Sequence, residues 1–343
     1  MVSDRVLVTG ATGFVAKNCI AACLKAGFAV RGTVRDRSRA DEIEKALRRA
    51  GVDHSPIELV EADLLRDENW DQALDGCRYV LHVASPFPLN EPRSPNELIR
   101  PARDGAERVM RAAARAGAER LVQTSSVAAV MHSSRPNEEP RTETDWTNLN
   151  DPEVATYARS KTLAERAIWK LHEELKSEGT TMEVATINPG VVLGPALDRD
   201  LSTSHALVRM IARGVYPALP KVAFPVADVR DVAHHHVLAL THPAAPGNRW
   251  LSCDGSLSLR EMGQIIVETL PDLKRKVPTI ELPSGLVRLF SHFDRNLKSI
   301  RVDLGRANRC DTSKSEQQLG MSFRSAKEAV RAAALSLREL KVI

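Results

Sequence analysis

The sequence of 343 residues lacks several features that would assign it to a specialised class of protein. It has five cysteines, an odd number, and no Cys-x-x-Cys pair, so it has neither the disulfide framework of a small secreted protein nor a paired-thiol motif. It has no internal repeat and no low-complexity segment, which excludes a repeat array. No apolar run approaches the ~18 residues that are needed to cross a bilayer. We therefore expect free thiols in a reducing compartment, and the cytosol as the location.

A large excess of charge of one sign is also lacking. There are 48 Lys and Arg residues against 44 Asp and Glu residues, for a net charge of +4, and the basic residues are scattered along the chain. A nucleic-acid-binding protein would concentrate them on one face. No signal peptide precedes the first predicted strand, which begins near Arg5. We therefore expect neither nucleic acid nor a membrane as a partner, and whether the chain forms a homodimer is left open.

What the sequence does contain is a regular alternation of apolar strands and helical segments through its first 190 residues. We predict strands at 5–8, 29–34, 57–61, 79–83, 120–124 and 182–188, and helices at 15–25, 41–50, 70–74, 96–116 and 154–175. An irregular loop, rich in Ser, Pro and Asn, interrupts the alternation at 131–152. This pattern predicts a parallel sheet that is covered by helices on both faces, which is a Rossmann-type, doubly wound α/β fold.

After residue 190 the pattern changes to short strands, short helices and Pro-rich connections. We assign residues 1–190, with about 226–242, to a dinucleotide-binding domain. We assign residues 191–225 and 243–343 to a smaller, mixed α/β lobe that binds the substrate.

The first strand leads directly into a glycine-containing loop. Gly10 and Gly13 are followed by Ala16, and the segment lies between a predicted strand and a predicted helix, the context in which this spacing binds a dinucleotide. Gly10 permits a tight turn, Gly13 lets the backbone approach a pyrophosphate, and Ala16 is small enough for close packing of helix and strand. The helix N-terminus then presents free N–H groups to the phosphates. We predict that Gly10, Thr12 and Gly13 bind the cofactor.

The end of the second strand distinguishes between the two nicotinamide dinucleotides. NAD-binding proteins usually place an acidic residue here for the ribose 2′-hydroxyl, whereas NADP-binding proteins place an Arg nearby for the 2′-phosphate. Arg35 comes first after the strand, with Arg31, Arg37 and Arg39 close by, although Asp36 keeps NAD as an alternative. A guanidinium matches the geometry of a phosphate, so we predict NADP(H).

Two further segments lie where such a cofactor would pass. Asp63 and Leu64 follow the third strand, where a carboxylate can accept a hydrogen bond from the adenine amino group. Val83, Ala84 and Ser85 follow the fourth strand, under the expected path of the cofactor. These segments follow the glycine loop along the chain in the order expected of a dinucleotide-binding fold.

A Tyr-x-x-x-Lys pair and a Ser are predicted to form the catalytic set. Tyr157 and Lys161 are four residues apart on a predicted helix, so both side chains lie on one face. A free phenol has a pKa of about 10, and both the Lys161 ammonium and an oxidised nicotinamide favour the phenolate. Ser126 follows the fifth strand, at the same sheet edge as the glycine loop.

This set predicts the reversible reduction of an aldehyde or ketone with NADPH, and hence a small carbonyl compound as the substrate. We expect Tyr157 to donate a proton to the carbonyl oxygen and Ser126 to hydrogen-bond that oxygen. We expect Lys161 to lower the pKa of Tyr157 and to hold the nicotinamide ribose.

As a set, these motifs resemble those of the extended short-chain dehydrogenase/reductases, and within them the group of dihydroflavonol reductases, cinnamoyl-CoA reductases and aldehyde/ketone reductases. The matching segments, in chain order, are TGATGFVA, TVRD, HVASPF, QTSSVAAV, YARSKTLAERA, INPGVVLGP and DVRDVA. The resemblance implies that further residues contact the cofactor: Phe14 and Val15 just after the loop, Pro189 and Val192 beside the nicotinamide, and Ser204 near the phosphates. It also matches Arg35 to the arginine that selects NADP in this group.

Two departures from the group bear on the substrate. Flavonoid reductases carry Asn five residues after the catalytic Ser, where this chain has Met131, which argues against a flavonoid. Cinnamoyl-CoA reductases have a Cys in the Tyr-x-x-x-Lys segment, where this chain has residues 158–160 as Ala-Arg-Ser, which argues against a CoA thioester. Met131 and His132, with Phe87, are candidates for the substrate pocket. A general aldehyde or ketone reductase fits best.

Two alternatives remain. An NAD-dependent sugar-nucleotide epimerase or dehydratase would use the same three residues, but Arg35 argues against it. A non-catalytic dinucleotide sensor typically lacks the Tyr or the Lys, and this chain has both. A metal site at His234–His236 is not expected, because consecutive side chains on a helix point about 100° apart.

Overall fold

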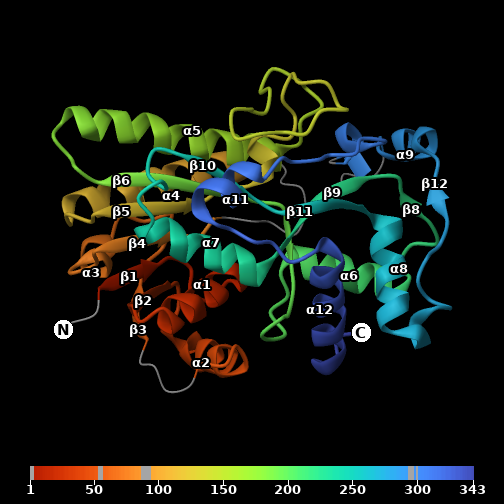
Figure 1. Ribbon diagram of the computed structural model, residues 1–343, viewed down its shortest axis with the longest axis horizontal. Helices are drawn as coiled ribbons and strands as arrows, with labels where there is room; N and C mark the ends of the chain where they lie inside the picture. Colours follow the sequence, from red (N-terminus) through yellow and green to blue (C-terminus); the bar gives the residue numbers. More distant parts are fainter. Residues whose placement is uncertain (1–3, 53–56, 86–93, 293–296, 299) are drawn as a thin grey trace.

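The computed structural model describes residues 4–52, 57–85, 94–292, 297–298 and 300–343. Its centre is a seven-stranded sheet in the order β10-β6-β5-β4-β1-β2-β3, with every neighbouring pair parallel (Figure 1). The strands are β1 (Arg5–Val8), β2 (Ala29–Val34), β3 (Glu58–Glu61), β4 (Tyr79–His82), β5 (Arg120–Thr124), β6 (Glu183–Pro189) and β10 (Arg249–Ser252). The predicted Rossmann-type fold is confirmed.

Helices cover both faces of this sheet because successive residues of each strand point to opposite faces and both sets are apolar. Val6 and Val8 face one layer, whereas Leu7 faces the other. The first layer contains α1 (Phe14–Lys25), α2 (Ala40–Arg49) and α7 (Val229–Thr241). The second contains α3 (Trp70–Leu74), α4 (Asn96–Arg115) and α5 (Thr156–Ser177).

A smaller lobe with its own apolar core lies beside the sheet, on the right in Figure 1. Its strands are β7 (Val191–Leu193), β8 (Leu219–Pro220), β9 (Ala223–Asp228), β11 (Asp254–Ser258) and β12 (Glu281–Leu282), in a three-stranded sheet β11-β9-β7 and a two-stranded sheet β12-β8. Its helices are α6 (Thr203–Arg213), α8 (Leu259–Thr269), α9 (Ser284–Phe290) and α12 (Ala326–Glu339). The short helix α11 (Ser313–Leu319) packs instead on β10 of the large sheet, with Leu319 in the core of that sheet. Within the described residues, no helix is long and apolar enough to cross a membrane.

The expected boundary between the two parts differs from the structure at two strands. β10 lies in the stretch 243–343 that we assigned to the lobe, yet it extends the large sheet by pairing with β6, with Trp250 fully buried. Conversely, residues 226–228 belong to β9 of the small sheet. Both differences arise from long-range strand pairing, which four- to six-residue strands do not reveal in their own sequence.

Gly190 makes the crossing from the large sheet to the small one. β6 ends at Pro189 and β7 begins at Val191. A Cβ atom on Gly190 would lie 2.4 Å from the Pro225 carbonyl oxygen, so only a glycine allows these two backbones to approach so closely. The close approach places the start of the lobe directly beside the carboxyl end of β6.

Candidate active site

The glycine loop has the backbone geometry that its sequence predicts. Gly10 has a φ of +69°, and a Cβ atom on it would lie 2.9 Å from the Cβ of Ala84, beyond the end of β4. Gly13 is the N-cap of α1, and among the described residues no side chain caps that helix. The first turn of α1 also carries no acidic residue. Its N–H groups are therefore free to bind an anion such as a pyrophosphate.

Threonine side chains anchor this loop to the neighbouring strands. The Gly10 N–H donates to the Thr33 hydroxyl at 3.0 Å, and the Ala84 N–H donates to the Thr9 hydroxyl at 2.9 Å. The Thr9 hydroxyl also lies 3.0 Å from Nδ1 of His82 on β4. The loop is consequently held at the carboxyl ends of three strands, where open α/β sheets bind ligands.

The four arginines in and just after β2 have different surroundings. Arg31 is buried and donates to backbone carbonyls at the end of α3, at 2.7–3.1 Å. Arg39 pairs with Glu42 and with Asp200, at 2.7 Å and 2.5 Å. Arg35 and Arg37 are exposed, and no ion pair or side-chain hydrogen bond involves them within the described residues. Of the nearby arginines, these two are thus free to meet a phosphate.

Asp36 is occupied in the protein itself. Its carboxylate accepts a hydrogen bond from the Ser38 N–H at 2.8 Å and thereby caps the short 3₁₀ helix η1 (Arg37–Arg39). Hydrogen bonds from Ser38 hold the pKa of Asp36 below its usual value. Because the Asp36 carboxylate is used as a cap, it is a weaker candidate for binding the ribose 2′-hydroxyl of NAD.

The residues predicted to lie along the adenine side of the cofactor follow β3 and β4 in the structure. Asp63 accepts a hydrogen bond from the Leu65 N–H at 3.0 Å, which shapes the turn after β3. The Cβ of Leu64 lies close to Gly105 on α4, where an added Cβ would be 3.0 Å away. Val83, Ala84 and Ser85 are half-buried and follow β4. Phe87, a candidate for the substrate pocket, lies outside the described residues.

The catalytic candidates meet at the carboxyl end of β5. Ser126 is buried and caps the short 3₁₀ helix η2 (Val127–Ala129) by accepting from the Ala128 N–H at 3.2 Å. It shares a hydrogen bond with the phenol of Tyr157, on the first turn of α5. Lys161 follows one turn later, with its Nζ 5.9 Å from the centre of the Tyr157 ring. The structure therefore brings the three predicted residues together.

Burial dominates the ionisation of this set. It raises the pKa of Tyr157 above its usual value, against the opposing effect of the Ser126 hydrogen bond. The net direction is upward because desolvation disfavours the phenolate; the expected effect of Lys161 on this pKa stays a prediction. Burial also lowers the pKa of Lys161 to about 8, although the nearby Glu165 raises it. The phenol thus carries its proton at neutral pH, as a proton donor requires.

An apolar cluster beside Ser126 unites several predicted residues. Met131 is one of its buried members, and Val15 from α1 and Val192 from β7 pack against it. Pro189 is buried at the end of β6. Ser204 lies in the first turn of α6. This turn is close to the glycine loop: the ring of His205 lies 4.4 Å from that of Phe14, which directly follows Gly13.

His132 is buried next to Met131 and faces the lobe. Its Nε2 lies 3.9 Å from a carboxylate oxygen of Asp303, and its Nδ1 has no hydrogen-bond partner among the described residues. Burial lowers the pKa of His132, with Asp303 acting in the opposite direction. His132 is consequently neutral at ordinary pH.

The three consecutive histidines of α7 point apart. His234 is exposed, and His236 joins Thr124 and the Val232 carbonyl oxygen at 2.7 Å each. His235 packs against the rings of Trp250 and Phe323. His235 and His236 therefore act as packing and hydrogen-bonding groups of the helix.

Sequence reasoning missed two buried charged residues near the site. Lys17 on α1 is 1% exposed and pairs with Glu42 and Asp198, which ties α1 to the segment before α6. Glu165 on α5 is fully buried and accepts hydrogen bonds from four side chains. The only signal for Glu165 in the sequence is its spacing, one further turn beyond Tyr157 and Lys161.

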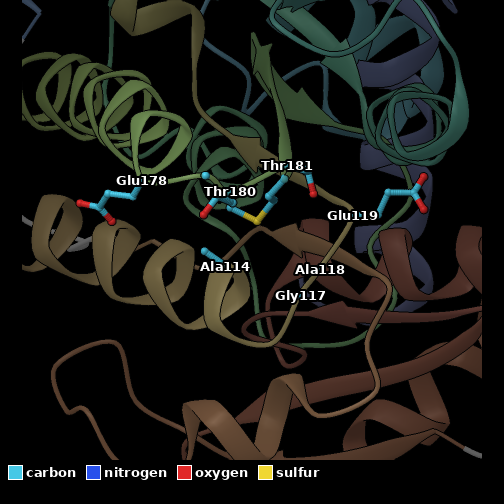
Figure 2. Close-up of a pocket in the computed structure, with 9 residues that line it drawn as sticks. Ala114, Gly117, Ala118, Glu119, Glu178, Thr180 and Thr181 are labelled. Carbon is cyan, nitrogen blue, oxygen red and sulfur yellow. The ribbon is translucent and has the colours of Figure 1, made fainter.

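A hollow of about 430 Å³ lies at the opposite edge of the sheet. Figure 2 shows it between the turn at Gly117–Glu119, before β5, and the turn at Glu178–Met182, before β6. It is thus at the amino ends of these strands, whereas Ser126 and Pro189 lie at the carboxyl ends. We do not connect it with catalysis, because ligands of open α/β sheets bind at the carboxyl ends.

Comparison with known proteins is consistent with this arrangement. A family model described as the NAD dependent epimerase/dehydratase family matches residues 6–251. Cinnamoyl-CoA reductase CAD2 of Medicago truncatula is 33% identical over 277 residues, which cover 78% of this chain and 82% of the relative. Cinnamoyl-CoA reductase 1 of Petunia hybrida is 31% identical and covers 92% of each chain.

Among solved structures, the chain is similar to the yeast methylglyoxal/isovaleraldehyde reductase Gre2 complexed with NADPH. The TM-score is 0.80 at 25% identity, and the match covers 99% of this chain and 100% of the other. Gre2 from Candida albicans in complex with NADPH gives a TM-score of 0.79 at 26% identity, with 98% and 99% covered. The similarity spans both the large sheet and the lobe.

Proposed function

The chain belongs to the NAD dependent epimerase/dehydratase family, within the extended short-chain dehydrogenase/reductases, and from this premise we propose that it reduces aldehydes or ketones to alcohols with Ser126, Tyr157 and Lys161 as its catalytic residues. It is an NADP-dependent oxidoreductase, as its similarity to reductases and to an NADPH complex supports. One observation carries the proposal: the Ser126–Tyr157 hydrogen bond lies at the sheet edge where α1 presents its uncapped N-terminus.

The residues present fit NADPH. Gly10, Thr12 and Gly13 would hold the pyrophosphate at the start of α1, where a Cβ on Gly10 would collide with Ala84. Arg35 would meet the 2′-phosphate, because it is exposed and Asp36 is engaged as a cap. When bound, the nicotinamide supplies a hydride to the carbonyl carbon.

Other residues extend the same path. We propose that Asp63, Leu64, Val83, Ala84 and Ser85 lie along the adenine side, and Phe14, Val15, Pro189, Val192 and Ser204 along the phosphates and nicotinamide. We retain the division into a dinucleotide-binding part and a substrate lobe, with β10 transferred to the former. The cytosol stays our proposed location.

The protein's own contribution is to move one proton and to hold one oxygen. Tyr157, whose phenol carries its proton at neutral pH, donates that proton to the substrate oxygen as negative charge develops there. Ser126 shares its hydroxyl with Tyr157 and hydrogen-bonds the same oxygen. The Lys161 ammonium stabilises the tyrosinate that is left and holds the nicotinamide ribose.

The substrate that fits best is a simple aldehyde or ketone. Met131 lines the apolar cluster next to Ser126 and offers no hydrogen bond of the amide kind for a flavonoid hydroxyl. Arg159, inside the Tyr-x-x-x-Lys segment, donates to the carbonyl oxygens of Leu149, Asp151 and Val154 and so holds the preceding loop. Its charge is therefore committed within the protein.

The test is a panel of aldehydes, ketones and diketones with NADPH, followed at the nicotinamide absorbance. We expect turnover with NADPH well above that with NADH, and the reverse reaction with the matching alcohol and NADP⁺. NADPH binding without turnover of any carbonyl would instead indicate a dinucleotide sensor. Tightly retained NAD with activity on a sugar nucleotide would indicate an epimerase.

A further inference from the structure

Glu165 is a buried carboxylate that the proposed reaction does not use directly. Its side chain is 0% exposed and lies on α5, one helical turn beyond Lys161. A buried carboxylate is costly unless hydrogen-bond donors and a counter-charge surround it. In this protein they come from three different strands or strand ends.

The Oε2 atom of Glu165 faces the segment that carries Ser126. It accepts from the Ser125 hydroxyl at 2.5 Å and from the Asn188 amide at 2.8 Å. The same Asn188 amide donates to the Ser126 carbonyl oxygen at 3.2 Å, and Asn188 directly precedes Pro189. One oxygen therefore links the end of β5 to the end of β6.

The Oε1 atom faces β10 and the middle of β6. It accepts from the Arg249 Nε at 2.6 Å and from the Thr186 hydroxyl at 2.9 Å. Arg249 in turn donates to the Glu143 and Asp145 carbonyl oxygens, at 2.7 Å and 2.6 Å, and stacks 3.6 Å from the Trp146 ring centre. Among the described residues, Arg249 is the ion-pair partner of this carboxylate.

We propose that Glu165 is a positioning residue of the catalytic centre: its carboxylate holds the strand ends that carry Ser126 and Pro189 in register with α5, and it balances the charge of Lys161. This inference rests on the proposed function, since it concerns the same catalytic set. It adds a residue that touches neither substrate nor cofactor and acts through Ser126 and Lys161.

Within the part of the chain that the structure describes, few charges surround Lys161, which makes the charge balance measurable. Tyr157 and Glu165 flank it on α5, and His82 faces it from β4 with a pKa of about 3, so that it is neutral. Arg249 lies behind Glu165 on β10. The α4 helix, packed along α5, places its Arg111 against Glu174, well beyond this turn.

Glu165→Gln and Arg249→Gln change this balance in opposite directions. Loss of the Glu165 charge lowers the pKa of Lys161 and of Tyr157, so the fall of NADPH-dependent activity at high pH should move to lower pH. Loss of the Arg249 charge leaves Glu165 unbalanced, raises both pKa values, and should move the same limb to higher pH. If Glu165 had a purely structural role, both variants would lose activity, but the pH at which activity falls would not move in opposite directions.

Ser125→Ala tests the geometric half of the proposal. It removes one donor to Glu165 but keeps every charge, so we expect kcat to fall about tenfold to a hundredfold through misplacement of Ser126. The pH at which activity falls in alkaline solution should not change, and the KM for NADPH should stay within about twofold of the wild-type value. Glu165→Asp, which keeps the charge on a shorter side chain, should behave like Ser125→Ala. An unchanged kcat in both variants overturns the geometric half.

A measurement without cofactor separates this inference from the proposed function. The Lys161 amine of the cofactor-free protein is labelled with formaldehyde and cyanoborohydride across pH, and the peptide is quantified by mass spectrometry. The wild-type midpoint is expected near the pKa of about 8, lower in Glu165→Gln and higher in Arg249→Gln. Movement in one direction only, or none, overturns the charge half even if the wild type reduces carbonyls. If the labelling midpoints of the two variants move in opposite directions but the wild type reduces no carbonyl compound, only the proposed function is refuted.

Discussion

Replacement of Arg35 by Ala should separate the two nicotinamide cofactors. Arg35 is exposed after β2 and makes no ion pair within the described chain, so nothing in the protein itself is broken by its removal. A charge-assisted hydrogen bond contributes about 1.5–3 kcal/mol. Because solvent screens an exposed guanidinium, the lower end applies, and we expect NADPH affinity to fall about 10-fold to 30-fold.

The affinity for NADH should change by less than about twofold, since NADH has no 2′-phosphate for a guanidinium to bind. Titration of the intrinsic fluorescence with each cofactor measures both constants. A rise in salt from about 0.05 M to about 0.5 M should reduce the ratio of NADPH affinity to NADH affinity in the wild type, because the contact between Arg35 and the 2′-phosphate is electrostatic.

Arg39→Ala is the matched control. Its guanidinium is already engaged by Glu42 and Asp200, so its loss should loosen the segment before α6 and affect both cofactors alike. Equal loss of both cofactors in Arg35→Ala, or selective loss of NADPH in Arg39→Ala alone, would refute the assignment of Arg35.

The other predictions concern catalysis, the glycine loop and acid stability. Tyr157→Phe removes the proton donor, so kcat should fall at least about a hundredfold while NADPH binding, read by fluorescence, is kept; appreciable turnover would contradict its role. Gly10→Ala meets both a φ of +69° and the Ala84 side chain at 2.9 Å, so it should weaken NADPH and NADH together and lower the melting temperature; an unchanged affinity would argue against a tight loop. His235→Leu should flatten the loss of stability in acid, because burial lowers the pKa of His235 to about 3 and only the unfolded chain takes up a proton below about pH 6.5. Between about pH 6 and pH 4 the wild type should lose about 2.5 kcal/mol more than this variant in urea unfolding, and an equal loss in the two proteins would contradict the role of His235.

The alternating elements were predictable because each carries its signal locally. The runs at 29–34, 70–74 and 120–124 form β2, α3 and β5 with the predicted bounds, since apolar periodicity and nearby glycines mark them. β10 was not assigned to the large sheet, because its four residues join it only through pairing with β6. A strand's partner is a property of the folded chain.

The same contrast holds within the site. Ser126, Tyr157 and Lys161 follow recognisable segments, and the structure brings them together. The four arginines in and after β2 look alike in the sequence, and only their surroundings divide them into buried Arg31, paired Arg39 and exposed Arg35 and Arg37. Phe87 lies outside the described residues, so its place in the substrate pocket stays a prediction.

By itself, the sequence determined the fold class, the dinucleotide loop and the identity of the catalytic candidates, because glycine spacing, helical spacing and strand alternation act over a few residues. The tertiary structure decided how those candidates are held and charged. Glu165 meets Arg249 from 84 residues away, and Lys17 meets Asp198 from 181 residues away. Burial, which no local pattern measures, raises the pKa of Tyr157 in the folded chain. Desolvation depends on every element packed around a group, and for that reason it emerges only when the chain is folded.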